Sequence, residues 1–378
     1  MTKFAKISLV AAVAVAGLTT ANAQPLEEAI KGVDVSGVMR YRYETINAAE
    51  LNGAASTANI NSNDYRLDVK TSAKVNDIVK ANVTVGITGN NGGGISSTSN
   101  ITASAVSTEI ADGEAGLSVR DANFAFALPY ATVIAGKQSV PGPFVDNTVD
   151  DITRGTGVVA LIPVGGFTLA AGTFNNTTLG GYDASEVALI GNIAGVSFDV
   201  WAARAVNAGT SGKDATLVSY HANGSVAGIA VDARYSTKDI GSADDASLAK
   251  VVASTKVAGI DVAAGYISTG KASTAGVALD GDNDAAVDAK VWQASMGGLN
   301  DASAILVSAG TTLVDNVYGK ATYITVDDAL NNITITETLA DLSYTMSKNF
   351  VVSSKYSVMT KDGYSDSTKT RLEVKYTF

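Results

Sequence analysis

The last eleven residues of the chain, 368–378, read TKTRLEVKYTF and carry the pattern that decides the fold. Leu372, Val374, Tyr376 and Phe378 are apolar or aromatic, and the residues between them are charged or polar. Strict alternation with a period of two predicts a β-strand with one apolar and one polar face. An aromatic last residue and cations on the polar face are typical of the strand that closes an outer-membrane β-barrel.

The first 23 residues have the organisation of a secretory signal peptide. Residues 1–6 carry two lysines and no acid, residues 7–18 form a twelve-residue apolar run, and Ala21-Asn22-Ala23 supplies a cleavage site with small residues. The apolar run is too short for a retained transmembrane helix. We therefore expect export and a mature chain, residues 24–378, that forms a single barrel domain.

The composition excludes several other classes of protein. The chain has no cysteine, so disulfide bonds and thiolate metal sites are impossible. Charged residues make up 17% of the chain, below the roughly 25% of soluble domains. Loss of Lys3 and Lys6 with the signal peptide changes the formal net charge from −10 to −12. A chain this acidic, with no Lys/Arg-rich run, is not expected to bind nucleic acid, and its charge favours passage of cations if it forms a pore.

The alternation of apolar and polar residues recurs along the rest of the chain. Residues 33–45 form the first predicted strand, and a polar stretch, residues 46–63, separates it from the second. Short connections are then expected at 76–77, 129–130, 163–166, 194–195, 224–225, 258–259 and 347–349, and long polar ones at 89–116, 175–184, 238–246 and 269–286. Short turns at one end and long loops at the other predict an up-and-down transmembrane barrel.

The number of strands follows from the spacing of these segments. Nineteen segments look like strands, but a barrel with both termini at one end needs an even number, so one assignment between residues 297 and 333 must be wrong. The length of the mature chain suits eighteen tilted strands of about 9–11 residues with their connections, and sixteen is the alternative. A barrel of this size encloses an aqueous channel rather than a packed interior.

Several stretches together resemble the major outer membrane protein of Campylobacter and related bacteria, a porin family. They are SLVAAVAVAG and ANAQ in the leader, PLEEAIKGVDVSGVMRYRYET at 25–45, VIAGKQ at 133–138 and the terminal RLEVKYTF. The resemblance implies an 18-stranded homotrimeric barrel that passes small hydrophilic solutes across the bacterial outer membrane. It also implies that the loop after the fifth strand folds inward, and that Phe378 acts as an assembly signal.

Residues 140–157 are therefore the candidate constriction loop. They contain Asp146, Asp150, Asp151 and Arg154, and the prolines and Phe144 near their start favour a stiff loop. The alternative is an ordinary surface loop whose acids are solvated. The three aspartates are also weak candidates for binding a divalent cation such as Ca²⁺; no other cofactor is expected.

The opposite side of the pore can be assigned from strand parity, because the last strand of a closed barrel pairs with the first. The polar faces of the last strand and the first two carry eight cations and five acids. The cations are Arg40, Arg42, Arg66, Lys70, Lys74, Lys369, Arg371 and Lys375, and the acids are Asp34, Glu44, Asp64, Asp68 and Glu373. This basic wall, facing the loop aspartates, would create a transverse field that sorts solutes by charge. We expect Arg40, Arg42 and Arg66 to reach the constriction; the alternative is that the cations only solvate the lumen.

Other chemistry is sparse. The single histidine, His221, lies in a predicted strand, and no base–nucleophile pair is evident, so catalysis is not expected. Residues 280–284 (DGDND) resemble the start of a calcium loop, but Ala285 and Val291 stand where an EF-hand needs glycine and glutamate. The default for this segment is a solvated surface loop.

These observations favour a general diffusion porin with mild cation selectivity. A surface adhesin that uses its long loops and a channel specific for one class of solute are alternatives on the same barrel. A soluble secreted β-protein is a further alternative, which requires polar residues on the outside of the fold.

Overall fold

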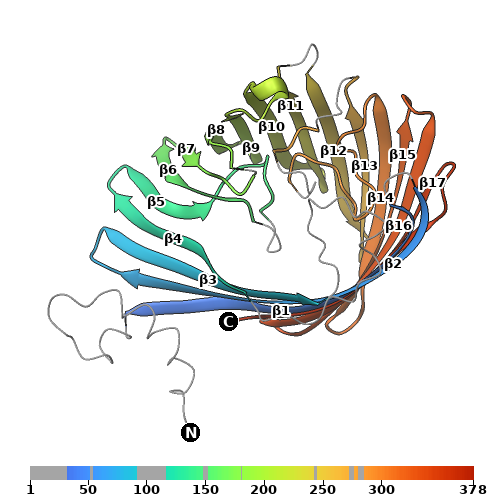
Figure 1. Ribbon diagram of the computed structural model, residues 1–378, viewed down its shortest axis with the longest axis horizontal. Helices are drawn as coiled ribbons and strands as arrows, with labels where there is room; N and C mark the ends of the chain where they lie inside the picture. Colours follow the sequence, from blue (N-terminus) through green and yellow to red (C-terminus); the bar gives the residue numbers. More distant parts are fainter. Residues whose placement is uncertain are drawn as a thin grey trace, which may run out of the picture.

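A computed structural model describes residues 32–51, 54–91, 116–147, 152–179, 181–241, 245–271, 276–279 and 285–378. The predicted signal peptide lies outside the described residues. One antiparallel sheet of eighteen strands closes into a barrel (Figure 1). The strands are β1 (Val33–Leu51), β2 (Ala54–Lys74), β3 (Val79–Asn91), β4 (Gly116–Leu128), β5 (Ala131–Ser139), β6 (Arg154–Val164), β7 (Phe167–Asn175), β8 (Ala184–Ile193), β9 (Val196–Ala205), β10 (Ala215–Val226), β11 (Ile229–Asp239), β12 (Ala246–Val257), β13 (Ile260–Thr269), β14 (Ala302–Val314), β15 (Val317–Asp328), β16 (Ile333–Ser347), β17 (Phe350–Lys361) and β18 (Ser367–Thr377).

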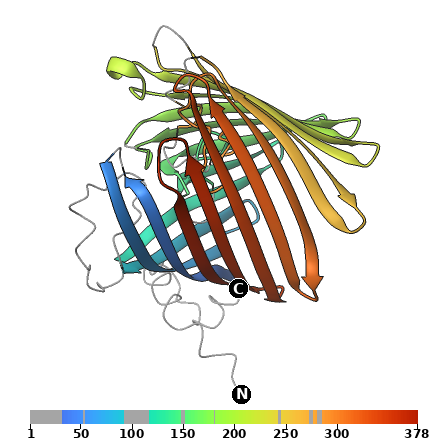
Figure 2. The same cartoon turned by 90° about the vertical axis from the view of Figure 1, so that its right-hand side faces the viewer.

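The barrel closes where the two ends of the chain meet. β18 pairs antiparallel with β1, and Figure 2 shows the last strands beside the first two. The Gly37 N–H donates to the Phe378 carbonyl at 2.8 Å, and the Phe378 N–H donates back to the Gly37 carbonyl at 3.0 Å. The prediction of eighteen strands is therefore confirmed, and sixteen is wrong. Between residues 297 and 333 the structure has two strands, β14 and β15.

The short connections all lie at one end of the barrel, which is the periplasmic end in proteins of this architecture. Three of them share an Ala-Gly pair, residues 194–195, 227–228 and 258–259, in which both residues have positive φ. Positive φ at both central positions defines the type I′ turn, whose twist matches that of the flanking strands. The predicted turn at 224–225 is wrong by three residues, because the Ala-Gly pair at 227–228 makes the turn and β10 continues to Val226.

The long connections lie at the other end, with one correction. The polar stretch 46–63 does not separate β1 from β2; both strands continue through it to Leu51 and from Ala54, in register apart from one irregularity near Ala48. Extended pairing satisfies the backbone hydrogen bonds of this hairpin whether or not its side chains are apolar. Polarity alone was therefore the wrong criterion for a loop.

The two faces of the barrel differ as the alternation predicted. The outward positions of β1 and β18 carry exposed apolar or aromatic side chains, among them Met39, Tyr41, Tyr43, Leu372 and Tyr376. Met39 is the most exposed of these five, at 57%. The charged residues of these strands take the opposite parity, toward the lumen. The alternative of a soluble β-protein is wrong, because an outer surface of exposed apolar side chains needs a lipid environment. Among the described residues, no helix is long and apolar enough to cross a membrane.

Part of the lumen is filled by a hydrophobic cluster that the alternation did not predict. Apolar inward side chains on β7–β10 and β12–β15 form it, and they pack against residues from the β5–β6 and β13–β14 connections. Its fully buried members include Phe144, Leu217, Leu248, Met296, Ile324 and Val287. The lumen therefore has one side packed with apolar side chains, whereas β18, β1 and β2 carry the charged ones.

Candidate pore constriction

The described part of the β5–β6 connection, residues 140–147 and 152–153, folds into the barrel. Phe144 and Val145 are 1% and 2% exposed, and a Cβ placed on Gly142 would lie 3.0 Å from Glu186 Oε2 and 3.1 Å from the Trp201 ring on the inner wall. The Val140 N–H donates to the Thr153 carbonyl at 2.9 Å, and the Thr153 N–H donates to the Asp146 carbonyl at 3.0 Å. The inward loop is confirmed and the ordinary surface loop is wrong.

The charged residues of this loop are placed differently from the prediction. The loop ends at Thr153, not at Gly157, because residues from Arg154 onward pair with β5 as the start of β6. Asp146 is 1% exposed, so its carboxylate faces protein rather than the pore. Asp150 and Asp151 lie outside the described residues. The acidic side of the predicted transverse field therefore stays a prediction.

A second segment enters the lumen from the β13–β14 connection, residues 270–301. The sequence predicted a long polar loop over residues 269–286, and the connection instead continues to Asp301, with residues of its described part inside the lumen. The Leu279 N–H donates to the Phe144 carbonyl at 2.7 Å, and the Val287 N–H donates to the Pro143 carbonyl at 3.2 Å. The two connections are thus hydrogen-bonded to each other inside the barrel. Residues 280–284 lie outside the described residues.

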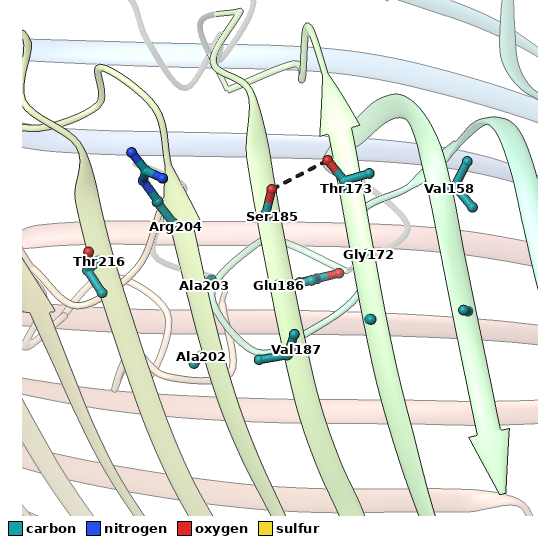
Figure 3. Close-up of a pocket in the computed structure, with 12 residues that line it drawn as sticks. Val158, Gly172, Thr173, Ser185, Glu186, Val187, Ala202, Ala203, Arg204 and Thr216 are labelled. Atoms are coloured by element: carbon teal, nitrogen blue, oxygen red, sulfur yellow. Dashed lines mark hydrogen bonds between the residues drawn. The ribbon is translucent and has the colours of Figure 1, made fainter.

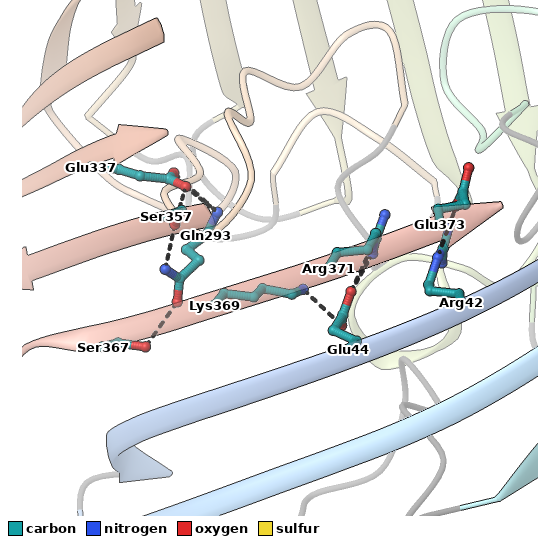
Figure 4. Close-up of polar contacts among 9 residues, drawn as sticks. All are labelled: Arg42, Glu44, Gln293, Glu337, Ser357, Ser367, Lys369, Arg371 and Glu373. Atoms are coloured by element: carbon teal, nitrogen blue, oxygen red, sulfur yellow. Dashed lines mark hydrogen bonds and ion pairs between the residues drawn. The ribbon is translucent and has the colours of Figure 1, made fainter. Parts of the chain in front are cut away.

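Glu337 on β16 anchors this second segment. Its carboxylate is fully buried and accepts the backbone N–H groups of Trp292 at 3.2 Å, Gln293 at 3.0 Å and Ala294 at 2.8 Å. The Gln293 side chain donates to Ser357 Oγ at 2.6 Å and accepts from Ser367 Oγ at 2.8 Å (Figure 4). One buried carboxylate thus binds three consecutive backbone donors, and the adjacent side chain spans β17 and β18. Residues 292–294 are held against the wall by this set of contacts.

The wall carries a continuous series of ion pairs from β18 to β6. Three of them, Arg42 with Glu373 and both Arg371 and Lys369 with Glu44, are drawn in Figure 4. The others are Arg40–Asp64, Arg66–Asp68, Arg120–Asp68 and Arg154–Asp121. Seven cations share five acids, so the series is net positive. The local excess of positive charge expected from the sequence is present, but much of it is compensated by neighbouring carboxylates.

The remaining residues of the predicted basic wall lie nearer the periplasmic end. Lys74 pairs with Asp77 of the β2–β3 turn at 2.7 Å, so it belongs to the rim of the barrel. Lys70 and Lys375 have no ion-pair partner among the described residues. Lys375 stands beside Arg40 in the β1–β18 register, and Arg40 stands beside Arg66 in the β1–β2 register. Three cations therefore lie side by side on adjacent strands.

Arg120 is a member of the wall that the sequence reasoning missed. It lies at an irregularity of the β3–β4 pairing, between Val119 and Asp121, where the register skips one residue. Such a bulge redirects side chains, and here both Arg120 and Asp121 form ion pairs of the wall. The guanidinium lies over Gly86, where a Cβ would overlap it. Two adjacent charged residues inside an alternating strand were the available signal for the bulge.

The lone histidine lies on the other side of the lumen, in the wall formed by β9–β11. His221 Nδ1 is 2.6 Å from Asp199 Oδ2, and its Nε2 is 2.8 Å from Asp232 Oδ2. A protonated ring can donate from both nitrogens and satisfy both carboxylates. Arg234 lies 3.5 Å from Asp199 and completes a compact charged cluster. In the part of the chain that is described, no three metal-ligating side chains are grouped as a metal site would require.

A hollow of about 540 Å³ lies on the outside of the barrel, across β6–β10 (Figure 3). It is formed by small outward side chains, among them Ala160, Ala171 and Ala202, below a row of Thr173, Ser185 and Arg204. Glu186 has the opposite parity and belongs to the inner wall. The hollow therefore faces the membrane and is not part of the pore.

Comparison with known proteins agrees with this geometry. The sequence pattern of the Campylobacter major outer membrane protein family matches residues 2–229, which is more than half of the chain. A search of curated proteins finds no match. Among solved structures, Acinetobacter baumannii OccAB3 is 11% identical with a TM-score of 0.71, covering 92% of this chain and 99% of that one. Pseudomonas aeruginosa OccK3 (OpdO) is 13% identical with a TM-score of 0.70, covering 93% and 97%.

Proposed function

Because the chain belongs to the Campylobacter major outer membrane protein family, whose name places it in the bacterial outer membrane, we propose that it is a general diffusion porin. Ions and small hydrophilic solutes would pass through a charged constriction between the two inward connections and the wall of β18, β1 and β2. The observation that carries this proposal is the division of the lumen. Apolar side chains and the β5–β6 connection occupy one side, paired charges on β18, β1 and β2 line the other, and residues 292–294 of the β13–β14 connection reach across to β16–β18.

Mild cation selectivity is part of the proposal, and the charges of the long connections support it. In their described residues these connections carry eight aspartates and three lysines, and six of the aspartates remain when the buried Asp146 and Asp288 are set aside. Acids at a pore mouth raise the local concentration of cations. The ion-pair series inside the lumen is net positive, which opposes this effect and keeps the preference small.

Selectivity is tested with a matched pair of variants at one ion pair. Arg42 Nη2 lies 2.7 Å from Glu373 Oε2, so Arg42→Ala and Glu373→Gln each remove one charge of this ion pair and shift the local charge in opposite directions. We expect Arg42→Ala to shift the potassium-to-chloride permeability ratio toward potassium by about twofold, and Glu373→Gln to shift it toward chloride. Reversal potentials in planar bilayers under a KCl gradient measure both.

The outcomes separate the parts of the proposal. If the wild-type protein gives no ohmic single-channel steps, a porin is wrong and an adhesin becomes the better assignment. If it conducts but both variants keep the wild-type reversal potential, this ion pair does not line the constriction. An anion-selective wild type would overturn the cation preference alone.

Three further properties belong to the same proposal. A porin of this kind catalyses no reaction, and transport depends only on pore size and wall charge. We propose a homotrimer, which chemical crosslinking in detergent would detect as a threefold mass. Weak divalent-cation binding at Asp146, Asp150 and Asp151 is retained as a proposal, although the burial of Asp146 leaves the other two to supply the ligands.

A further inference from the structure

Trp292, in the β13–β14 connection, lies against the charged wall. Its ring centroid is 4.9 Å from Lys369 Nζ, 5.3 Å from Arg371 Cζ and 5.9 Å from Lys355 Nζ. The side chain is 8% exposed. Cations within about 6 Å of an indole face are attracted by its quadrupole. Cations from two adjacent strands, β17 and β18, therefore converge on one ring.

The position of this ring is set by its backbone and not by its polar atom. Buried tryptophans usually donate their indole N–H to an acceptor, but within the described residues Nε1 of Trp292 has none. Instead the backbone N–H of Trp292 donates to Glu337, and the neighbouring Gln293 side chain bridges Ser357 and Ser367. These contacts hold the indole ring beside the cations.

The cations under the ring are incompletely compensated. Lys369 Nζ and Arg371 Nη2 lie 3.2 and 2.6 Å from the two oxygens of one carboxylate, that of Glu44. Two positive charges thus share one negative charge. Their side chains remain partly exposed, at 15% and 19%, so the remaining positive charge acts on the lumen. The indole ring covers part of these two cationic side chains, and its quadrupole attracts them away from the solvent.

We propose that Trp292 is a selectivity-determining residue of the pore, because its indole covers Lys369 and Arg371 and reduces the positive potential that they present to permeating ions. This inference rests on the proposed porin function. It assigns to the second inward connection a role in charge selection that a purely space-filling loop would not have.

Bilayer recordings of Trp292→Ala and Trp292→Phe test the proposal. We expect Trp292→Ala to raise the chloride-to-potassium permeability ratio by about two- to fivefold, which corresponds to the loss of one exposed cation–π contact. Trp292→Phe keeps an aromatic face and should give a smaller shift in the same direction. A larger conductance with an unchanged ratio would overturn the proposal, since it would show that the indole only occupies space.

A second experiment removes one of the cations under the ring. In a Lys369→Met background, Trp292→Ala should change the chloride-to-potassium permeability ratio less than in the wild type. The substitution of Lys369 has already removed part of the positive charge that the loss of the indole would uncover. Equal changes in both backgrounds would exclude an action through Lys369.

A readout that needs no conduction keeps this inference separable from the proposed function. Acetylation of the folded, detergent-solubilised protein, followed by mass spectrometry, reports the accessibility of Lys369. We expect about two- to fivefold faster modification of Lys369 in Trp292→Ala, with Lys348, in the β16–β17 turn, as the internal reference. An unchanged Lys369 rate would overturn the covering role even if the wild type proves not to conduct.

Discussion

At the scale of the residue, the charged wall depends on the lack of a side chain at Gly86. The Arg120 guanidinium crosses the space above Gly86 to reach Asp68 Oδ1 at 2.8 Å. The same carboxylate binds Arg66 through its other oxygen at 2.7 Å. Arg120 therefore joins the pair on β2 to the bulge on β4, and only a glycine at position 86 leaves room for it.

Gly86→Ala is expected to displace Arg120 and break its ion pair with Asp68. The barrel should still fold, because the outward face is untouched, but with a loss of about 1 kcal/mol or less from a partly exposed ion pair. The freed guanidinium should alter single-channel conductance and shift selectivity toward anions. Planar-bilayer recording and thermal unfolding in detergent measure the two effects.

The control for this variant is Gly116→Ala, at the start of β4, where a Cβ would have nothing within 4 Å. It introduces the same methyl group one strand away without touching Arg120. Indistinguishable channels from the two variants would show that Arg120 has no role in conduction.

Strand parity predicted which residues of β1, β2 and β18 face the lumen, since a period of two fixes the side of every residue. It could not predict the diagonal pairing of Arg40 with Asp64 or the directly opposed pairing of Arg42 with Glu373, because both depend on register and rotamers. Arg120 was not predicted as a residue of the wall, for a related reason. A one-residue bulge reverses parity beyond it, and no length or composition rule locates such a bulge.

At the scale of the element, the two inward connections differ in how far the sequence could predict them. The β5–β6 connection was identified through its resemblance to a porin family. The β13–β14 connection was predicted only as a long polar loop over residues 269–286, with no inward course. The overlooked signal lay in the strands, where Leu217, Leu248 and Ile324 are apolar at inward positions. An apolar lumen wall requires a cover, and only a connection can supply it.

Glu337 is expected to hold residues 292–294 in place. Glu337→Ala removes the acceptor for three buried N–H groups and should cost about 2–4 kcal/mol of local stability, because charged acceptors are worth more than neutral ones and buried donors would be left unpaired. Hydrogen exchange of the Trp292, Gln293 and Ala294 amides should accelerate accordingly. Open-channel current noise should rise as the segment becomes mobile.

Asp341→Asn on the same strand is the matched control. Asp341 also faces the lumen, but its contact with Lys355 is long, at 3.5 Å, and partly exposed, so a small effect is expected. Glu337→Gln keeps one oxygen and should fall between alanine and the wild type. Slow exchange of residues 292–294 in Glu337→Ala would contradict the anchoring role.

At the scale of the whole molecule, closure of the barrel depends on one pairing, that of β1 with β18, which we call the seam. Every other pairing joins strands that are adjacent in sequence, whereas β1 and β18 lie at opposite ends of the chain and can pair only after both have formed. An unpaired edge in the membrane would expose a row of backbone donors and acceptors to lipid. The alternating termini therefore had to be complementary, which is why the last eleven residues were so informative about the fold.

Phe378 is expected to decide whether this seam forms. Its backbone exchanges two hydrogen bonds with Gly37, its ring stacks on Tyr376 with centroids 5.8 Å apart, and it also lies against Gly37, where a Cβ would meet it. Deletion of Phe378 should lower the yield of heat-modifiable barrel in the outer membrane severalfold, because both seam hydrogen bonds and the stacked ring are lost. Phe378→Ala, which keeps the terminal backbone but removes the ring, separates the two contributions. A reduced yield in both variants would assign the effect to the ring, whereas a reduced yield in the deletion alone would assign it to the terminal hydrogen bonds. Wild-type yields in both would show that the barrel closes without its last residue.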